Sequence, residues 1–328
     1  MGSGFREAGY RVALAVEEDR NAAQTYRANN PGVPVLEADV AKLDAKVIRR
    51  IVPGLRRIDT LLAGPPCQGY SAAGLREPDD PRNQLFRHVG RLARELKARV
   101  VVLENVPGLR RVNGTGFLHR ILCSLRAQGY SAAAYLLRAY DFGVSQDRKR
   151  YFILARRRED GTAPVQPEPA HRPPGDRKNT RLAKTPSLTA ALRGLPRYGP
   201  GIEAEWRVLR GGRQLLNAST MQHSRRLVAK IRKIRSGKGP MSYRRLDRDL
   251  ARTLVAGHRA LPVHPDLNRT ISVREAARIQ GFPDTYVFCG PRAEQPLQVA
   301  NAVPPPLAAA VAKHLLKYLT DGGAKARK

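Results

Sequence analysis

Four side chains with complementary chemistry lie beside apolar runs of this sequence. Cys67 and Glu104 each come at the end of such a run, and Arg148 and Arg150 lie at the start of another. A cysteine thiolate can add to a carbon of an electron-poor ring, while a carboxylic acid bonds a ring nitrogen on which charge develops. An arginine can hold a carbonyl oxygen of the same ring. From spacing alone, packing or capping by these residues stays an open alternative.

The segments that must position these side chains alternate between apolar and amphipathic over the first 158 residues. Runs typical of buried strands occupy 11–16, 60–64, 99–105 and 150–156, and helical spacing occurs at 20–29 and 85–98. This alternation predicts an α/β fold with a doubly wound, parallel sheet that helices cover on both faces. Ligands of such sheets bind at the carboxyl ends of the strands, so Cys67 and Glu104 are expected at one rim.

The charge of the chain indicates a polyanionic partner. Lys and Arg number 59 against 28 Asp and Glu, a net charge of +31, and 22 of these cations fall in 171–260 with five acids. This basic stretch follows a Pro-rich segment at 163–176 that is typical of a linker. Nucleic acid is the favoured partner, and a merely Arg-rich, ribosome-like protein is the alternative.

A basic helix is predicted within this stretch, in "RRLVAKIRKIRSGKG" at 225–239. Its cations are expected to contact phosphates, although a solvated helix face has the same pattern. The candidate DNA-binding residues are Arg225, Arg226, Lys230, Arg232, Lys233 and Arg235.

Several other classes of protein do not fit the sequence. No apolar run approaches the roughly 20 residues of a membrane span, and Arg6 argues against a signal peptide or myristoylation site. The three cysteines form no CxxC pair, and the seven histidines form no metal-binding motif. A reduced, cytoplasmic and nucleoid-associated protein without a metal site is therefore expected.

Five motifs resemble, in the same order, those of the prokaryotic DNA (cytosine-5)-methyltransferases. They read "GPPCQGYS", "LENV", "QDRKRYF", "RTISVREAARIQGFPD" and "QVANAVPPPLAAAV", and the resemblance runs from about residue 4 to about residue 316. One such motif alone is a weak signal, whereas five in order are specific. The resemblance implies a Rossmann-like methyltransferase sheet, S-adenosylmethionine as the cofactor and a second, smaller basic target-recognition domain.

The resemblance also implies roles for the residues around the reacting base. Cys67 corresponds to the nucleophile that attacks cytosine C6, and Glu104 to the residue that binds and protonates N3. Arg148, with Arg150, corresponds to the helper at the base. Gln68 and Ser71 belong to a loop that closes over the DNA in the family. The target cytosine must leave the duplex to reach these groups.

Three regions follow from the same resemblance. Residues 1–162 correspond to the catalytic and cofactor-binding domain, 163–262 to the target-recognition domain, and 263–328 to the C-terminal return that completes the catalytic domain. The helix in "PPPLAAAVAKHLLKYL" is expected to pack on the catalytic domain because its apolar residues recur at helical spacing.

Cofactor residues are carried over one at a time. Glu17 corresponds to the acid that binds ribose hydroxyls, and Asp39 to the acid that binds the adenine amino group. For Leu85 and Val303, core packing is an equal alternative. The remaining candidates, at the adenine, the methionine part or the nucleophile loop, are Glu18, Val40, Pro66 and Asn301.

Two departures from the family pattern stand out. The sequence "MGSGFREAGY" already resembles the helix that follows the family's first strand and Gly-rich turn, so both are expected to be missing. A sheet without a central strand leaves neighbouring strands unpaired. Ala300 also replaces a usual glycine.

Three functions are compared on these grounds. A DNA (cytosine-5)-methyltransferase of a restriction-modification or orphan system is favoured, with duplex DNA and a cognate restriction endonuclease as partners and a monomeric state. An RNA (tRNA) cytosine-5 methyltransferase has the same motifs but typically a smaller recognition region. A catalytically silent DNA-binding remnant is the third reading, because of the missing strand and turn.

Overall fold

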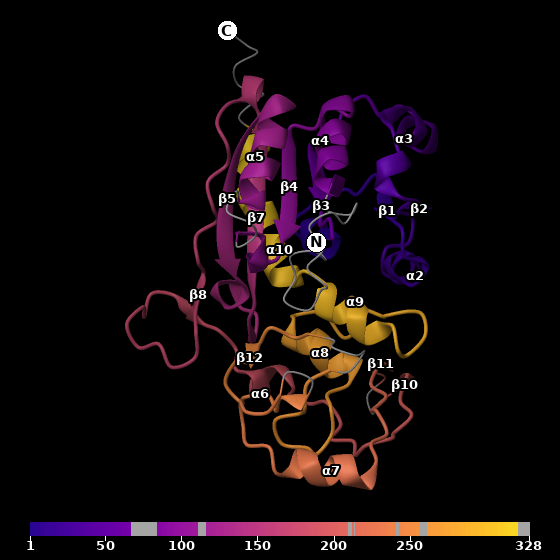
Figure 1. Ribbon diagram of the computed structural model, residues 1–328, viewed down its shortest axis with the longest axis vertical. Helices are drawn as coiled ribbons and strands as arrows, with labels where there is room; N and C mark the ends of the chain where they lie inside the picture. Colours follow the sequence, from indigo (N-terminus) through magenta and orange to yellow (C-terminus); the bar gives the residue numbers. More distant parts are fainter. Residues whose placement is uncertain are drawn as a thin grey trace.

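An upper part built around a β-sheet and a lower part with little regular structure make up the chain (Figure 1). The computed structural model describes residues 1–66, 84–110, 116–208, 212, 214–240, 243–255 and 261–320. The upper part comprises the described residues of 1–170 and 303–320, and the lower part comprises those of 171–302.

The main sheet of the upper part has four strands. Across the sheet they are β3 (Thr60–Ala63), β4 (Val100–Asn105), β7 (Lys149–Arg157) and β5 (Tyr130–Arg138). β3 and β4 are parallel, as predicted, but β7 is antiparallel to both of its neighbours. The connection between β5 and β7 is short and contains only η5 (Ala139–Phe142) and the two-residue strand β6 (Gln146–Asp147), which cannot make the crossover that a parallel pair needs. The sheet is therefore mixed, and the prediction of a wholly parallel sheet is wrong at β7.

A second, two-stranded sheet stands beyond β3 (Figure 1). It consists of the parallel strands β1 (Ala15–Glu17) and β2 (Val35–Glu37). Among the described strands, none pairs with the edges of β1 and β3 that face away from β2 and β4. The sheet is therefore in two pieces, with unpaired edges as expected for a sheet that lacks a central strand.

The two pieces share a layer of helices. The helices α3 (Ala45–Ile51) and α4 (Leu85–Glu95) contribute Ile48 and Leu92 to a cluster that also contains Leu14, before β1, and Leu61 of β3. Side-chain packing thus joins the pieces where backbone pairing does not.

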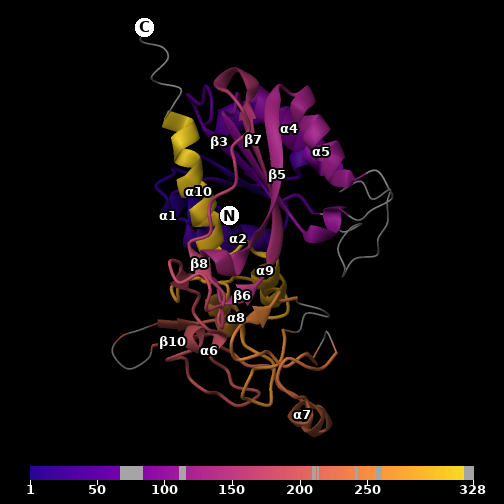
Figure 2. The same cartoon turned by 90° about the vertical axis from the view of Figure 1, so that its left-hand side faces the viewer.

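Helices cover both faces of the main sheet (Figure 2). α4 and α5 (Phe117–Ala127) pack on one face, and α1 (Gly2–Glu7) and α10 (Pro305–Thr320) pack on the other. A Cβ atom on Gly4 would lie 2.4 Å from the carbonyl oxygen of Pro305, so the contact between α1 and α10 requires glycine. The prediction that the C-terminal helix returns to the sheet is confirmed.

Sequence signals mark the helix starts. Asp19 accepts a hydrogen bond from Ala22 N at the start of α2 (Arg20–Asn29), a helix whose bounds match the predicted 20–29. Ser272 and Glu275 form a capping box at α8 (Val273–Ile279). These caps satisfy N–H groups that have no partner inside the helix.

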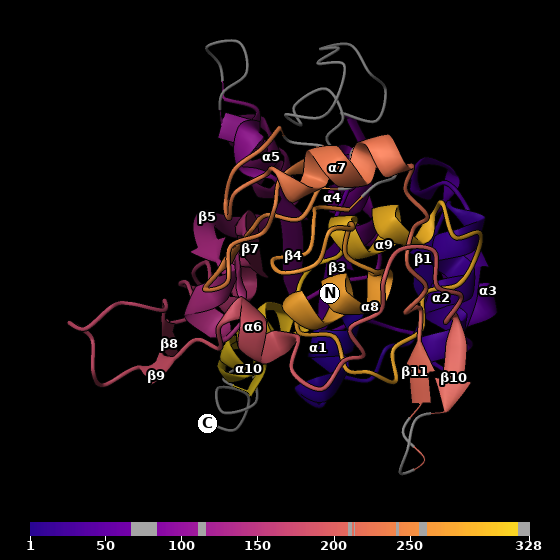
Figure 3. The same ribbon diagram turned by 90° about the horizontal axis from the view of Figure 1, so that it is seen from below.

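The lower part, seen from below in Figure 3, consists of short elements. They are β8 (His171–Arg172), β9 (Ala183–Lys184), α6 (Leu188–Ala191), β10 (Trp206–Val208), β11 (Gln214–Leu216), α7 (Arg225–Arg232), β12 (Ala251–Arg252), α8 and α9 (Gln295–Asn301). Its core joins Leu188 and Leu254 to Ile279 of α8 and Val299 of α9. Residues on both sides of 262 therefore share one core, while α10 belongs to the upper part; the functional division at 262 stays a prediction.

Buried arginines hold this irregular backbone together. Arg245 donates to the carbonyl oxygens of Ile231 and His264, at 2.9 Å each, and Arg269 makes a bidentate pair with Glu275 at 2.8 Å. Arginine suits this task because its planar fork supplies five donors, which can bond several backbone carbonyls at once. Part of the positive charge of 171–302 is thus structural and does not face a partner.

Candidate active site

The end of β4 brings a carboxylate and an arginine together. Glu104 lies opposite Phe152 of β7, and its Oε1 atom is 2.9 Å from Nε of Arg150. Both residues are 8% exposed. Burial lowers the pKa of Arg150, while the charge of Glu104 opposes that shift. The two predicted residues therefore form a buried ion pair at the carboxyl end of a strand.

Arg148 lies deeper than this pair. It is 0% exposed, and its three guanidinium nitrogens have no hydrogen-bond partner among the described residues. Burial lowers its pKa to about 9, helped by the charge of Arg150 and opposed by that of Glu104. A buried cation without a partner is costly, so such a group is typical of a site that a ligand completes.

Asn105 is a site residue that sequence analysis did not single out. Its Nδ2 atom donates to the carbonyl oxygen of Pro65 at 3.2 Å, and its Oδ1 atom accepts from Val106 N at 2.7 Å. The side chain therefore ties the segment that leaves β3 to the end of β4. The only signal in the sequence was a polar residue directly after Glu104.

The chain leaves β3 beside Glu104. A Cβ atom on Gly64 would lie 3.5 Å from Oε2 of Glu104. Cys67 follows Gly64 by three residues in the sequence. Cys67, Gln68 and Ser71 themselves are outside the described residues.

The start of α1 reaches the same rim. Cε of Met1 lies 3.7 Å from the position that a Cβ atom of Gly64 would take. Burial lowers the pKa of the Met1 amino group, and the negative charge of Glu104 opposes that shift. The rim near Glu104 is thus bounded by β3, β4, β7 and α1.

Two carboxylates lie at the corresponding edge of the smaller sheet. Glu17 ends β1, where its Oε1 atom accepts from Asp19 N at 3.1 Å, and Asp39 follows β2 closely. Asp39 Oδ1 accepts from Ala41 N at 2.8 Å, which leaves its second oxygen for another donor. Burial raises the pKa of Glu17. Because β1 and β2 are parallel and in register, both acids lie at one edge of this sheet.

The other cofactor candidates are dispersed. Val303 is buried among the core residues between α1, α10 and the main sheet, so it packs in the core, which was the alternative to a cofactor contact. Val40 packs beside α3 and α4, and Leu85 is the first residue of α4. The exposed candidates are Glu18, Pro66 and Asn301.

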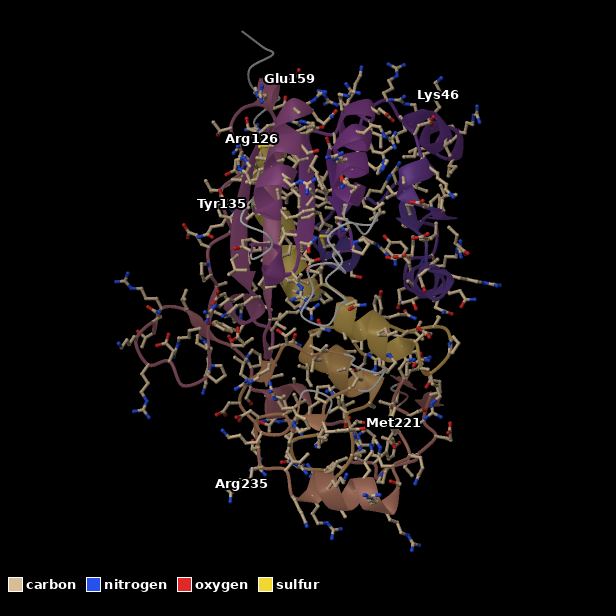
Figure 4. The ribbon with its side chains drawn as sticks, viewed as in Figure 1. Lys46, Arg126, Tyr135, Glu159, Met221 and Arg235 are labelled. Atoms are coloured by element: carbon tan, nitrogen blue, oxygen red, sulfur yellow. The ribbon has the colours of Figure 1, made fainter. Side chains whose placement is uncertain are left out.

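The predicted basic helix is α7, which lies at the lower end of the molecule (Figure 1). Ser224 caps its start by accepting from Leu227 N at 3.2 Å, and Ile231 anchors it in the lower part. The six predicted cations of this region are exposed, and none makes an ion pair with another described residue. Figure 4 shows Arg235 at this end and Lys46 of α3 at the opposite end.

The described ranges lack two further kinds of site or segment. They contain no group of three His, Cys, Asp or Glu side chains that could hold a metal ion. None of their helices combines the length and the apolar character needed to cross a membrane.

Comparisons with known proteins agree with this geometry. The family model for C-5 cytosine-specific DNA methylase matches residues 1–317. The Type II methyltransferase M1.HphI of Haemophilus parahaemolyticus is 33% identical, over 97% of this chain and 84% of the relative. M.XorII of Xanthomonas oryzae pv. oryzae is 32% identical, over 96% of this chain and 82% of the relative. The solved structure of a putative DNA modification methyltransferase from an E. coli prophage has a TM-score of 0.80 and 27% identity, and the match covers 97% of this chain and 95% of that one.

Proposed function

This chain belongs to the C-5 cytosine-specific DNA methylase family, and we propose that it transfers a methyl group from S-adenosylmethionine to C5 of a cytosine in duplex DNA through a covalent adduct with Cys67. The observation that carries the proposal is the buried Glu104–Arg150 pair beside the point where the chain leaves β3 toward Cys67. A carboxyl group and a thiol at one rim form the set of groups that addition to a pyrimidine ring requires.

Each catalytic side chain has one part in the reaction. The Cys67 thiolate forms a bond to C6, and Glu104 gives a proton to N3 as the ring electrons move toward C5. C5 then takes the methyl group from the sulfonium of the cofactor, which becomes a thioether. Loss of the C5 proton to solvent lets the ring expel the Cys67 thiolate, and the proton on N3 returns to Glu104.

Arg148 and Arg150 are proposed to hold the base. A cytosine inside a duplex is out of reach, so it must flip out of the stack into the pocket. The cytosine carbonyl oxygen would accept hydrogen bonds from the unpartnered nitrogens of Arg148. Arg150 keeps Glu104 aimed at N3 through their contact at 2.9 Å.

The residues at the edge of the smaller sheet fit the nucleoside end of S-adenosylmethionine. Ribose hydroxyls and an adenine amino group are donors, and Glu17 and the second oxygen of Asp39 are acceptors at adjacent strand ends. The cofactor supplies a methyl group activated by a positively charged sulfur. Glu17 and Asp39 would hold its nucleoside end so that this group faces the rim at Glu104.

The lower part is proposed to recognise and orient the DNA. The exposed cations of α7 would contact phosphates, which positions the duplex without reading its sequence. We extend the proposal to a target-recognition region at 163–262 in a monomeric enzyme. A cognate restriction endonuclease is a further proposed partner, because the relatives named above are Type II methyltransferases.

A methyl-transfer assay tests the proposal. Purified protein, unmethylated plasmid DNA and S-adenosylmethionine with a tritiated methyl group are expected to yield labelled DNA, and bisulfite sequencing is expected to map the label to cytosines. Transfer RNA in a parallel arm should stay unlabelled. Label in transfer RNA alone would indicate the RNA enzyme, and no label in either arm would indicate a silent DNA-binding protein.

A trapping experiment tests the nucleophile. Duplex DNA that contains 5-fluorocytosine should form a stable adduct with the protein, because fluorine at C5 blocks the final proton loss. Cys67→Ala should abolish the adduct, whereas Cys123→Ala and Cys289→Ala serve as controls that keep it. An adduct mapped to Cys123 or Cys289 would contradict the mechanism.

A further inference from the structure

A short strand pairing joins the lower part to the arginines of the site. β12 is parallel to β6 (Gln146–Asp147), and this is the only strand ladder between the upper and lower parts within the described ranges. Three more hydrogen bonds reinforce it. They are Ala251 N to Ser145 O at 3.1 Å, Thr253 Oγ1 to Asp147 O at 3.1 Å, and Leu254 N to Gln146 Oε1 at 3.4 Å.

The upper end of this pairing leads directly to the base-binding groups. β6 ends one residue before Arg148, and β7 begins one residue after it. Arg148 has no hydrogen-bond partner for its guanidinium among the described residues, so its position depends on the backbone that carries it. Any shift of Asp147 would therefore move the buried guanidinium.

The lower end leads to the proposed DNA-contacting helix. Leu254 belongs to the core of the lower part together with Leu246. The neighbouring Arg245 donates from Nη2 to Ile231 O, in α7, at 2.9 Å and from Nε to Ile234 O at 2.8 Å. A continuous set of contacts therefore runs from α7 through this core to the residues that pair with β6.

We infer that Thr253 is a positioning residue that couples the seating of the lower part on DNA to the placement of Arg148 and Arg150. Its half-buried hydroxyl donates to the carbonyl oxygen of Asp147 and so holds the backbone that enters β7. Contact of α7 with the duplex then favours one position of this backbone. The inference rests on the proposed function.

Substitutions at two threonines separate this role from a merely structural one. Thr253→Val removes the donor and keeps the shape, and Thr253→Ser restores the donor. Thr185→Val is the matched control, because Thr185 Oγ1 also donates to an upper-part carbonyl, that of Tyr140 at 2.7 Å, but leads to β8 and β9.

The first readout is the rate of a single turnover on unmethylated plasmid DNA with enzyme in excess. Thr253→Val is expected to slow methyl transfer about three- to tenfold, the range for one net hydrogen bond between neutral groups. The KM for DNA and its salt dependence should stay within about twofold of the wild-type values, since no phosphate contact is lost. Thr253→Ser and Thr185→Val should retain the wild-type rate.

The second readout is amide hydrogen exchange of residues 145–150, which does not depend on turnover. Plasmid DNA is expected to slow this exchange in the wild-type protein and in Thr253→Ser but not in Thr253→Val. If the wild type transfers no methyl group, the proposed function fails, and the exchange data still test the coupling.

Three results would overturn the coupling. One is a wild-type rate and wild-type exchange response in Thr253→Val. Another is equal slowing by Thr253→Val and Thr185→Val, which would indicate a general loss of structure. The last is weaker DNA binding by Thr253→Val with a salt slope shallower by about one, which would make the hydroxyl a phosphate contact.

Discussion

Nε of Arg150 and Oε1 of Glu104 lie 2.9 Å apart across the antiparallel strands β7 and β4. Both side chains are nearly buried, so each charge lies mainly against the other and not against water. The pair therefore fixes the direction of the carboxyl group at the rim. Removal of either side chain should change the rate of methyl transfer.

Glu104→Gln is expected to slow methyl transfer by about 100- to 10,000-fold, since an amide cannot give a proton to N3. Single-turnover labelling of plasmid DNA measures this effect. Glu95→Gln is the control, because Glu95 also pairs with an arginine, Arg91 at 3.0 Å, but lies on α4. Equal rates in Glu104→Gln and the wild type would contradict the role of Glu104.

Arg148→Met is expected to stabilise the protein and to impair methyl transfer. Methionine fills a similar volume without burying a charge that lacks a partner. We expect a gain on the order of 1–4 kcal/mol, the range found when apolar side chains replace a buried ion pair. Urea denaturation should show the gain in the free energy of unfolding, and the labelling assay the loss of rate. A destabilised Arg148→Met protein would indicate that the guanidinium already has a partner.

The salt dependence of DNA binding tests the role of α7. Replacing Arg225, Arg226, Lys230, Arg232, Lys233 and Arg235 by Gln should make the slope of log K against log salt shallower by up to about 5, at about 0.9 per phosphate contact. Fluorescence anisotropy with a labelled duplex measures this slope. The control replaces four exposed cations, Lys46 and Arg50 of α3 and Arg56 and Arg57 shortly after it in the sequence. α3 lies at the opposite end of the molecule from α7 (Figure 1). An equal change of slope per removed charge in the control would mean that DNA binding depends only on the total charge of the protein.

Glu17→Gln and Asp39→Asn are each expected to weaken S-adenosylhomocysteine binding about tenfold or more, because each removes a charged acceptor. Isothermal titration calorimetry measures the affinity. Glu37→Gln is the control, since Glu37 is exposed and pairs with Arg27. Unchanged affinity in the first two variants would place the cofactor elsewhere.

Stability is expected to fall as the pH drops from about 6.5 to 4. Burial lowers the pKa of His264 to about 4, so in this range the unfolded chain binds a proton that the folded chain does not. The loss is on the order of 3 kcal/mol, from about 1.4 kcal/mol per pH unit. Thermal denaturation against pH measures it. His264→Asn should flatten the profile, because its Oδ1 atom can accept from Asp266 N and Leu267 N, as Nδ1 of His264 does.

The sequence predicted the rim of the site because strand ends are local features. The apolar run before Glu104 sufficed to place this residue at the carboxyl end of a strand. A wholly parallel sheet would have put Arg150, at the start of its strand, at the opposite edge, and only the antiparallel β7 brings it to Glu104. Asn105 was missed because its role depends on a carbonyl of another strand. The motif gave Arg148 and Arg150 similar roles, and only the folded chain shows which one contacts Glu104.

Charge was harder to interpret than strand position. Arg245 was counted with the cations of the basic stretch 171–260, yet it is buried against the carbonyl oxygens of Ile231 and His264. Which cations turn inward depends on how the irregular backbone of the lower part folds, and periodicity carries no information about that. The antiparallel placement of β7 was missed for a related reason, since a short connection overrode the expected crossover.

The break between β1 and β3 has a consequence for local unfolding. The β1–β2 unit is held to the main sheet by side chains such as Leu14 and Leu61, without a backbone ladder among the described strands. It can open as a cooperative unit of its own, at a lower free energy than the buried strand β4. Binding of a nucleoside to Glu17 and Asp39 would order that unit, which costs conformational entropy. The binding entropy should therefore be large and unfavourable, and the amides of Val16 and Leu36 should become more protected from hydrogen exchange when the nucleoside is bound.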